Sequence, residues 1–264
     1  MTVSSDLLTP IKFGERNTGI GGSEVAKIAG ISPWGRPIDV WLRKMDMAPK
    51  QETSEAMQLG LDCEVMLDEW YQRATGYTTT EHPTVRRTDR PWQVGSVDRL
   101  VVGKELGVDF KTVGLATWGQ RHQWGDPGSD VVPPDVVAQC AWYMSMWDYP
   151  QWDVAALIAG RGRVLFHIHR DAKLEAALLA CAKRFWMGNV LANVEPEPDD
   201  SKSYRDWMKA KYAKPERGDI IAGNGELQES AIRLERIKGA IGKLTARQTG
   251  IENNSRYGIT VAHS

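Results

Sequence analysis

Two short stretches decide the fold: Gly95-Ser96-Val97-Asp98-Arg99-Leu100 and, shortly after it, Gly107-Val108-Asp109-Phe110-Lys111-Thr112. Their composition predicts two strands that pair as a hairpin. The first strand offers one carboxylate, Asp98. The second offers Asp109 and Lys111, whose side chains share a face because side chains alternate along a strand with period two. Two acids and a lysine on paired strands suit a divalent-metal phosphodiesterase site, since carboxylate oxygens bind hard cations and an ammonium orients water.

The bulk composition sets limits on the function. The chain has 264 residues, 42% hydrophobic and 25% charged, which is typical of a soluble globular protein. Its net charge is -1, so any positive charge that binds nucleic acid must be local or concentrated by oligomerisation. The three cysteines lie far apart and match no metal-ligand spacing, which indicates reduced thiols in a cytoplasmic protein and too few ligands for an iron–sulfur cluster. We expect no membrane segment, because no apolar run approaches the ~20 residues that span a bilayer.

The order of elements predicts an α/β (α+β) fold with a central mixed β-sheet flanked by helices. Strands are expected at 77–88, 92–102, 105–112, 152–158 and 163–169. Helices are expected at 24–29, 37–45, 54–75, 134–147, 171–192, 204–211 and 226–249, and residues 256–261 are compatible with a final strand. We expect a core domain over 1–194 and a helical C-terminal extension over 195–264 that packs on it.

Other polar residues are weaker candidates when each is taken alone. Glu64 lies on the long expected helix, where neighbouring acids favour a solvated acidic face. Gln139 is as compatible with a helix surface as with an active site. Trp118, Arg121 and Trp124 lie in a long loop, and loops of this length are usually functional or disordered. They would stack on unpaired bases and hold the DNA backbone, or else anchor the loop in the core or in a neighbouring subunit.

These residues belong to an ordered series of motifs that resembles the PD-(D/E)XK nuclease superfamily. Within that superfamily, the chain looks like the YqaJ-type phage recombination exonucleases, which are related to lambda exonuclease. The matching pieces follow the family's order: Arg16, Ile20–Ala26, Pro37–Trp41, Gly60-x-x-x-Glu64, Gly95–Asp98, Asp109–Lys111, Pro133 with Gln139 and Tyr143-Met144, and Trp152–Ala155. The Asp-x-Lys triplet alone occurs by chance, whereas the ordered series is specific.

The resemblance implies a restriction-endonuclease-like core and a Mg²⁺-dependent 5′→3′ exonuclease acting on linear double-stranded DNA. Such an enzyme degrades one strand to mononucleotides and exposes 3′ single strands for phage recombination. The resemblance further implies a homotrimer ring around DNA ends, a single-strand annealing protein as partner, and a place in the host cell cytoplasm.

The resemblance also carries roles over to individual positions. The implied metal ligands are Glu64, Asp98, Asp109 and the backbone carbonyl of Phe110, with two Mg²⁺ per site and Mn²⁺ able to substitute. Lys111 would act on the attacking water, and Gln139 would be a further polar group of the active site. The implied 5′-phosphate ligands are Arg16, Ser23 and Ser96. An arginine fork and a serine at an expected helix N-terminus suit a phosphate, although a surface arginine and a plain helix cap explain the same residues.

Two departures from the family pattern keep other functions open. Asp109 stands where glutamate is common, and Glu55 stands where a basic residue would help to hold phosphate. The alternatives are a structure-selective endonuclease on the same core and a non-catalytic DNA-binding module that kept the fold.

Overall fold

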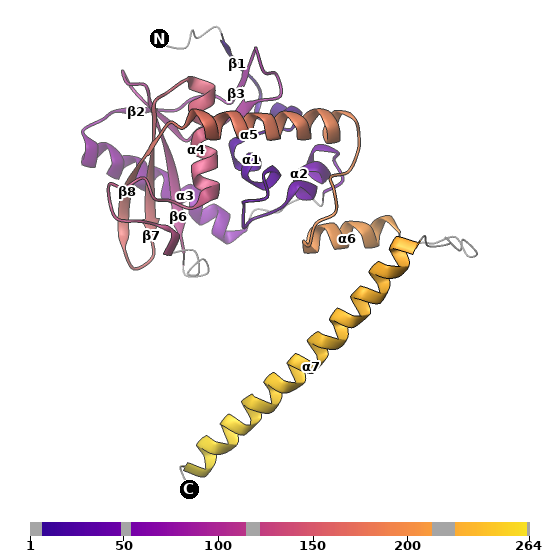
Figure 1. Ribbon diagram of the computed structural model, residues 1–264. Coiled ribbons are helices and arrows are strands. Elements are labelled where there is room, and N and C mark those ends of the chain that lie inside the picture. Colours follow the sequence, from indigo (N-terminus) through magenta and orange to yellow (C-terminus); the bar gives the residue numbers. More distant parts are fainter. Residues whose placement is uncertain (1–6, 49–53, 115–121, 213–224, 263–264) are drawn as a thin grey trace. The chain divides into compact units, whose positions relative to one another are not determined.

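The computed structural model describes residues 7–48, 54–114, 122–212 and 225–262, with the backbone alone for Phe13, Arg16 and 256–262. It divides into two compact units, Met1–Lys211 and Tyr212–Ser264. The first unit contains a mixed five-stranded sheet with flanking helices (Figure 1). The fold class expected from the sequence is therefore confirmed.

The central sheet has the strand order β2-β5-β6-β7-β8. Its strands are β2 (Thr79–Thr80), β5 (Arg99–Val101), β6 (Leu106–Val113), β7 (Gln151–Ile158) and β8 (Gly162–His169). Strands β6 and β7 are parallel, with Asp109 opposite Val154, and the other neighbouring pairs are antiparallel. A smaller antiparallel sheet contains β1 (Leu8–Pro10), β3 (Val85–Arg87) and β4 (Val94–Gly95).

The two faces of the central sheet are covered by different helices. Helix α3 (Glu55–Thr75) packs Leu67 and Tyr71 against Val108 and Phe110 of β6. Helices α1 (Gly22–Ile28) and α4 (Pro134–Trp147) pack against the opposite face. Because side chains alternate along β6, Asp109 and Lys111 face α4 while their neighbours face α3.

Helix α3 begins and ends where its sequence predicts. The side chain of Ser54 accepts a hydrogen bond from the backbone N–H of Met57 at 3.3 Å, which caps the first turn. Gly76 ends the helix in the left-handed conformation, at φ 72°. This helix carries Glu64 past β6.

The expected strand over 92–102 is wrong in one respect that matters for the site. It is two strands, β4 and β5, which belong to different sheets. At Gly95 a Cβ atom would lie 2.6 Å from Sδ of Met146, so only glycine lets the backbone pass this close to α4. The chain then turns through Ser96–Asp98 before β5 begins. Asp98 therefore lies on a turn between two sheets and not within a strand.

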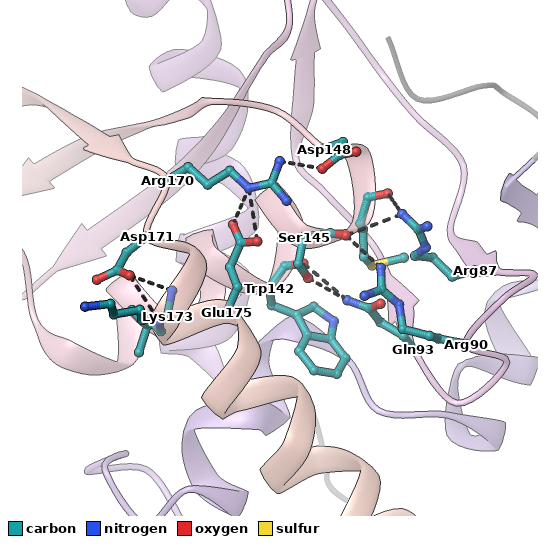
Figure 2. A network of polar contacts seen from close by, with 12 residues as sticks. Arg87, Arg90, Gln93, Trp142, Ser145, Asp148, Arg170, Asp171, Lys173 and Glu175 are labelled. Carbon is teal, nitrogen blue, oxygen red and sulfur yellow. Dashed lines mark hydrogen bonds and ion pairs between the residues drawn. The ribbon is translucent and has the colours of Figure 1, made fainter. Parts of the chain in front are cut away.

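A network of polar contacts fixes the C-terminal end of α4 (Figure 2). The Arg87 guanidinium donates a hydrogen bond to the carbonyl of Met146 at 2.9 Å, and that of Arg90 donates one to the carbonyl of Ser145 at 2.9 Å. The last carbonyls of a helix carry partial negative charge, so arginines there are favourable. Helix α4 is thus held at one end while its other end contributes to the site.

The remaining helices extend the first unit beyond the expected boundary at 194/195. They are α2 (Pro37–Lys44), α5 (Ala172–Phe185), a π-helical turn (Trp186–Leu191) and α6 (Lys202–Lys211). Trp207 of α6 meets Trp41 of α2 edge to face, with ring centroids 5.7 Å apart. The second unit contains α7 (Gly225–Ala262), so the possible final strand over 256–261 is helical instead. Across the described ranges, each helix is either too short or too polar to cross a bilayer.

Candidate functional site

The turn before β5 and the middle of β6 bring two acids and one lysine together. Asp98 Oδ2 accepts a hydrogen bond from the backbone N–H of Phe110 at 2.7 Å. Asp109, which is only 1% exposed, forms an ion pair with the ammonium of Lys111. The Lys111 side chain is 26% exposed, so its charged end can reach a bound substrate.

The backbone N–H and carbonyl of Phe110 are both directed towards Asp98. The carbonyl of Val113 accepts a hydrogen bond from Ala159 beyond the end of β7, so alternate residues of β6 direct their backbone groups to β7. In an extended strand the N–H and C=O of one residue point to the same side. Because the Phe110 N–H reaches Asp98, its carbonyl lies on the Asp98 side as well.

The site is strongly anionic, and this changes its acid–base behaviour. Burial, with a further contribution from the Asp109 charge, raises the pKa of Asp98 to about 8. Burial works against the Lys111 ammonium, but Asp109 and Asp98 outweigh it and raise the pKa of Lys111 above its usual range. Lys111 is therefore a fixed positive charge at neutral pH and not a free base.

Glu64 on α3 is part of the same electrostatic group. Burial raises the pKa of Glu64, Arg99 opposes this shift, and the charge of Asp109 adds to it. Arg99 also joins α3 to the Asp98 turn, because its guanidinium bonds to Asp68 on α3 at 3.0 Å and to the Asp98 carbonyl at 2.7 Å. Arg99 and Asp68 were not singled out from the sequence, where they look like ordinary surface charges.

The donor set fits a divalent cation of the Mg²⁺ type. In the part of the chain that the structure describes, no three His, Cys, Asp or Glu side chains form a closed ligand cage. Mg²⁺ usually takes only one or two protein carboxylates and completes its octahedron with water and substrate phosphate. Asp98, Asp109 and the Phe110 carbonyl supply hard oxygen donors, and a cation would offset the burial and the Asp109 charge that raise the pKa of Asp98.

A cavity of about 330 Å³ adjoins Lys111. It is lined by residues of α1, β6 and α4 and of the segments that join them: Ser23, Ala26, Lys27, Ser32, Trp34, Lys111, Thr112, Val113, Trp124, Pro133, Asp135, Val136 and Gln139. Three of the residues expected in the site, Ser23, Lys111 and Gln139, therefore share one hollow. Lys27 adds a second cation, although burial lowers its pKa from the usual value.

Ser23 is not the helix cap that the sequence suggests. The N-cap of α1 is Gly21, whose N–H donates to a carboxylate oxygen of Glu24 at 2.9 Å. Ser23 lies two residues after this cap and is exposed to the cavity. Gly22 lies against the ring of Tyr143, where a Cβ atom would come within 2.7 Å. A side chain at Gly22, the first residue of the helix, would therefore collide with this ring.

Tyr143 belongs to a motif that the sequence analysis names without giving this residue a role, and the structure places it in the site. Gln139 donates through Nε2 to Asp109 Oδ1 at 3.4 Å and to the Tyr143 hydroxyl at 3.1 Å. The Tyr143 hydroxyl in turn donates to the carbonyl of Ser96 at 2.8 Å. The available signal was the four-residue spacing of Gln139 and Tyr143, which places both on one face of a helix.

Tyr143→Phe tests this chain of hydrogen bonds. The variant keeps the ring but leaves the Ser96 carbonyl and Gln139 without their partner, so the turn that carries Asp98 is less well held. We expect a rate of DNA cleavage about tenfold lower, the effect typical of groups that orient metal ligands. Single-turnover cleavage measures it, with Tyr149→Phe as the matched control. Equal rates in the two variants would show that the hydroxyl does not position the site.

The remaining predicted contacts are only partly visible. Trp118 and Arg121 lie outside the described residues, and for Arg16 the structure gives only its backbone, in a 3-10 helix over Phe13–Thr18. Trp124 is 6% exposed and packs on Phe166 with ring centroids 5.3 Å apart, although it also lines the cavity. Its packing is that of a loop anchor, the second of the two interpretations left open by the sequence.

Behind the site, Asp153 on β7 joins three elements. Asp153 is 1% exposed and accepts hydrogen bonds from Tyr71 of α3 at 2.7 Å and Gln151 at 2.8 Å. Its other partner is His167 of β8, whose Nδ1 lies 2.7 Å from Asp153 Oδ1. Tyr71 lies two turns after Glu64 on α3, so this network holds the helix that carries the third acid. The sequence signal was a single acid within the apolar strand Gln151–Ile158.

Comparison with known structures shows a shared fold. The fold is shared with an alkaline exonuclease from Laribacter hongkongensis (TM-score 0.55, 20% identity, 76% of this chain and 96% of that chain). The same exonuclease in complex with dAMP gives a TM-score of 0.57 at 19% identity, with the same coverage. The chain therefore has the fold of this alkaline exonuclease.

The sequence profile of the YqaJ-like viral recombinase domain matches residues 13–150, more than half of the chain. The chain belongs to this family. It is also 26% identical over 247 residues to the uncharacterized protein YqaJ of Bacillus subtilis (strain 168), covering 92% of this chain and 76% of that protein.

Proposed function

We propose that the protein is a metal-dependent 5′→3′ exonuclease that degrades one strand of linear double-stranded DNA to mononucleotides. The observation that carries the proposal is the meeting of Asp98, Asp109 and Lys111 beside a cavity that also receives Gln139 and Ser23. The exposed 3′ strands would feed a phage recombination reaction in the host cytoplasm. A homotrimer ring and a single-strand annealing partner belong to the same proposal.

Each residue has a separate task in this reaction. Glu64, Asp98, Asp109 and the Phe110 carbonyl would hold Mg²⁺ or Mn²⁺, two ions per site. When bound there, such a cation supplies Lewis-acid stabilisation of the phosphate and acidifies the attacking water. The Lys111 ammonium orients that water and stabilises negative charge that develops on the phosphate. Gln139 holds Asp109 in place from α4.

The end of the DNA strand would be recognised at the α1 side of the cavity. Ser23 is exposed there, and Lys27 contributes a cation. Arg16 and Ser96 complete the proposed 5′-phosphate contacts, and Trp118 and Arg121 are the proposed DNA contacts. Placing the terminal phosphate beside Lys111 would put the first phosphodiester bond within reach of the acids.

One substrate series tests the proposal. The protein is incubated with Mg²⁺ and linear duplex carrying a 5′-phosphate, the same duplex with a 5′-hydroxyl, and a covalently closed circle. We expect mononucleotides from the 5′-phosphorylated duplex, slower release from the 5′-hydroxyl duplex, and an intact circle, with Asp109→Asn inactive throughout. Efficient cutting of the circle would instead identify a structure-selective endonuclease. DNA binding without cleavage in Mg²⁺ or Mn²⁺ would identify a non-catalytic module.

The high pKa of Asp98 predicts that activity depends on pH and Mg²⁺ together. Asp98 must lose its proton to bind a cation, so at limiting Mg²⁺ the rate rises as pH approaches about 8. Tenfold more Mg²⁺ is expected to move the midpoint of this profile down by about one pH unit, because one proton is exchanged for one cation. A midpoint that does not respond to Mg²⁺ would contradict the role of Asp98.

The same group predicts how stability changes with pH in the absence of metal. Between the usual carboxyl pKa and about 8, the folded protein binds a proton at Asp98 that the unfolded chain does not. The free energy of unfolding therefore falls as pH rises through this window. Urea titrations in EDTA measure the slope, and Asp98→Asn is expected to flatten it.

A further inference from the structure

Helix α7 lies outside the proposed catalytic machinery and has a surface that needs a partner. It is a single helix of 38 residues, about 57 Å long at 1.5 Å per residue. Its large apolar side chains between Ile232 and Ile251 are all exposed, from 48% to 64%. Helices in water gain most of their stability from packing of an apolar face, so a helix of this kind is expected to be covered in its working state.

The apolar residues of α7 follow a heptad repeat. With Leu234 as position a, Ile241 also falls at a, and Ile237, Leu244 and Ile251 fall at d. The flanking e and g positions are polar or small: Arg233, Lys238, Ala240, Thr245, Arg247 and Glu252. A seam of only a and d residues is narrower than the face of a helix that packs on a globular domain, and it is the pattern of a coiled coil.

The glycines of α7 support the same conclusion. Gly239, Gly242 and Gly250 lie within the helix at positions f, b and c, away from the seam. Glycine disfavours an isolated helix, because it gains more backbone freedom than other residues on unfolding. The seam from Leu234 to Ile251 is apolar at each a and d position except Gln248, whereas the outer face carries glycines, so another helix must supply much of the stability.

We propose that α7 forms a parallel coiled coil with α7 of other copies of this chain. Two features at neighbouring heptad positions support this partner and this parallel register. Gln248 is the polar residue at position a, where it meets the same amide of the other copy. Arg247 at g lies opposite Glu252 at e of the other helix, which gives one complementary pair on each side of the seam.

The charges within one helix prepare the pairing. Gln248 Nε2 donates to Glu252 Oε1 of its own helix at 2.9 Å, so Glu252 is already held beside the seam. Arg233 would face Lys238 of the second copy, but Lys238 is paired with Glu235 of its own helix at 2.9 Å, which offsets the repulsion. The two helices are therefore expected to pair most strongly over the segment from Leu234 to Ile251.

Cysteine cross-linking in the full chain tests the proposal. Ile241→Cys places a thiol at position a, where two copies meet in a parallel coil. Ile232→Cys is the matched control, since Ile232 is an equally exposed isoleucine at the outer position f. After mild oxidation we expect a cross-linked dimer from Ile241→Cys at least ten times faster than from Ile232→Cys or from the unsubstituted chain. Equal rates, or cross-links only after an annealing protein is added, would overturn the proposal.

A second measurement, helical circular dichroism, tests α7 whether or not the first unit also forms oligomers. Ile241→Asp puts a charge into the seam, and Ile232→Asp puts the same charge on the outer face. We expect Ile241→Asp to lower helical circular dichroism and remove its dependence on protein concentration, while Ile232→Asp behaves as the unsubstituted chain. The same loss in both variants would show that α7 is not held by a seam. Both tests leave the nuclease proposal untouched, because they use no DNA.

Discussion

Replacing Lys111 with alanine is expected to lower the rate of phosphodiester cleavage by about 10²–10³-fold, the cost of removing one preorganised charge from a partly dehydrated site. Asp109 and Asp98 keep the Lys111 pKa above its usual range, so the group is a permanent cation beside the acids. Its loss removes stabilisation of charge that develops on phosphate. The affinity for duplex DNA should change far less, because the proposed 5′-phosphate contacts are made by other residues.

Single-turnover cleavage of 5′-phosphorylated duplex at saturating Mg²⁺ measures the effect, with circular dichroism to verify the fold. Lys202→Ala is the control, since Lys202 is exposed and pairs only with Asp206 on α6. Lys111→Arg keeps the charge but not its shape and should recover only part of the rate. A rate within twofold of the unsubstituted protein in Lys111→Ala would remove this lysine from the mechanism.

The largest loss of stability is expected for Asp153→Ala. Asp153 is buried and accepts hydrogen bonds from Tyr71 and Gln151, and the imidazole of His167 lies within hydrogen-bond distance of it. Its removal therefore leaves several polar groups without a partner. Each buried polar group left without a partner costs about 1–3 kcal/mol, so the combined loss of unfolding free energy is expected to be about 3–5 kcal/mol. The anchor of α3 is lost as well, so the Mg²⁺ concentration needed for half-maximal cleavage should rise.

Urea unfolding of Asp153→Ala and Tyr71→Phe separates the contributions. Tyr71→Phe keeps the packing of the ring and loses one hydrogen bond, so a cost of about 1–3 kcal/mol is expected. Asp62→Ala on the exposed side of α3 should leave the midpoint unchanged. If Asp153→Ala unfolds at the same urea concentration as Asp62→Ala, the network does not hold the helix.

Local rules were enough to predict much of the catalytic strand. The alternation of β6 places Asp109 and Lys111 on one face from the sequence alone, and the structure has them in an ion pair. The bounds of α3 followed from Ser54 and Gly76, which are a helix cap and a left-handed terminator. The periodicity of helices and strands also gave the fold class, because it depends on residues close together in the chain.

Features that depend on distant contacts were not predictable in the same way. The break of 92–102 into two strands follows from the close approach of Gly95 to Met146, which no local pattern reveals. Tyr143 reaches Ser96 across 47 residues, and Tyr71 reaches Asp153 across 82. The type of Ser23 suits a helix cap, whereas in the structure the cap of α1 is Gly21.

The two-sided use of β6 has a consequence for how this chain tolerates variation. In a library that substitutes each position of the strand, abundance in the cell and DNA-degrading activity should separate with every second residue. Changes at Val108 and Phe110 would deplete soluble protein, while changes at Asp109 and Lys111 would leave the protein present but inactive. Substitutions in this strand are therefore limited by folding at one set of positions and by activity at the alternating set.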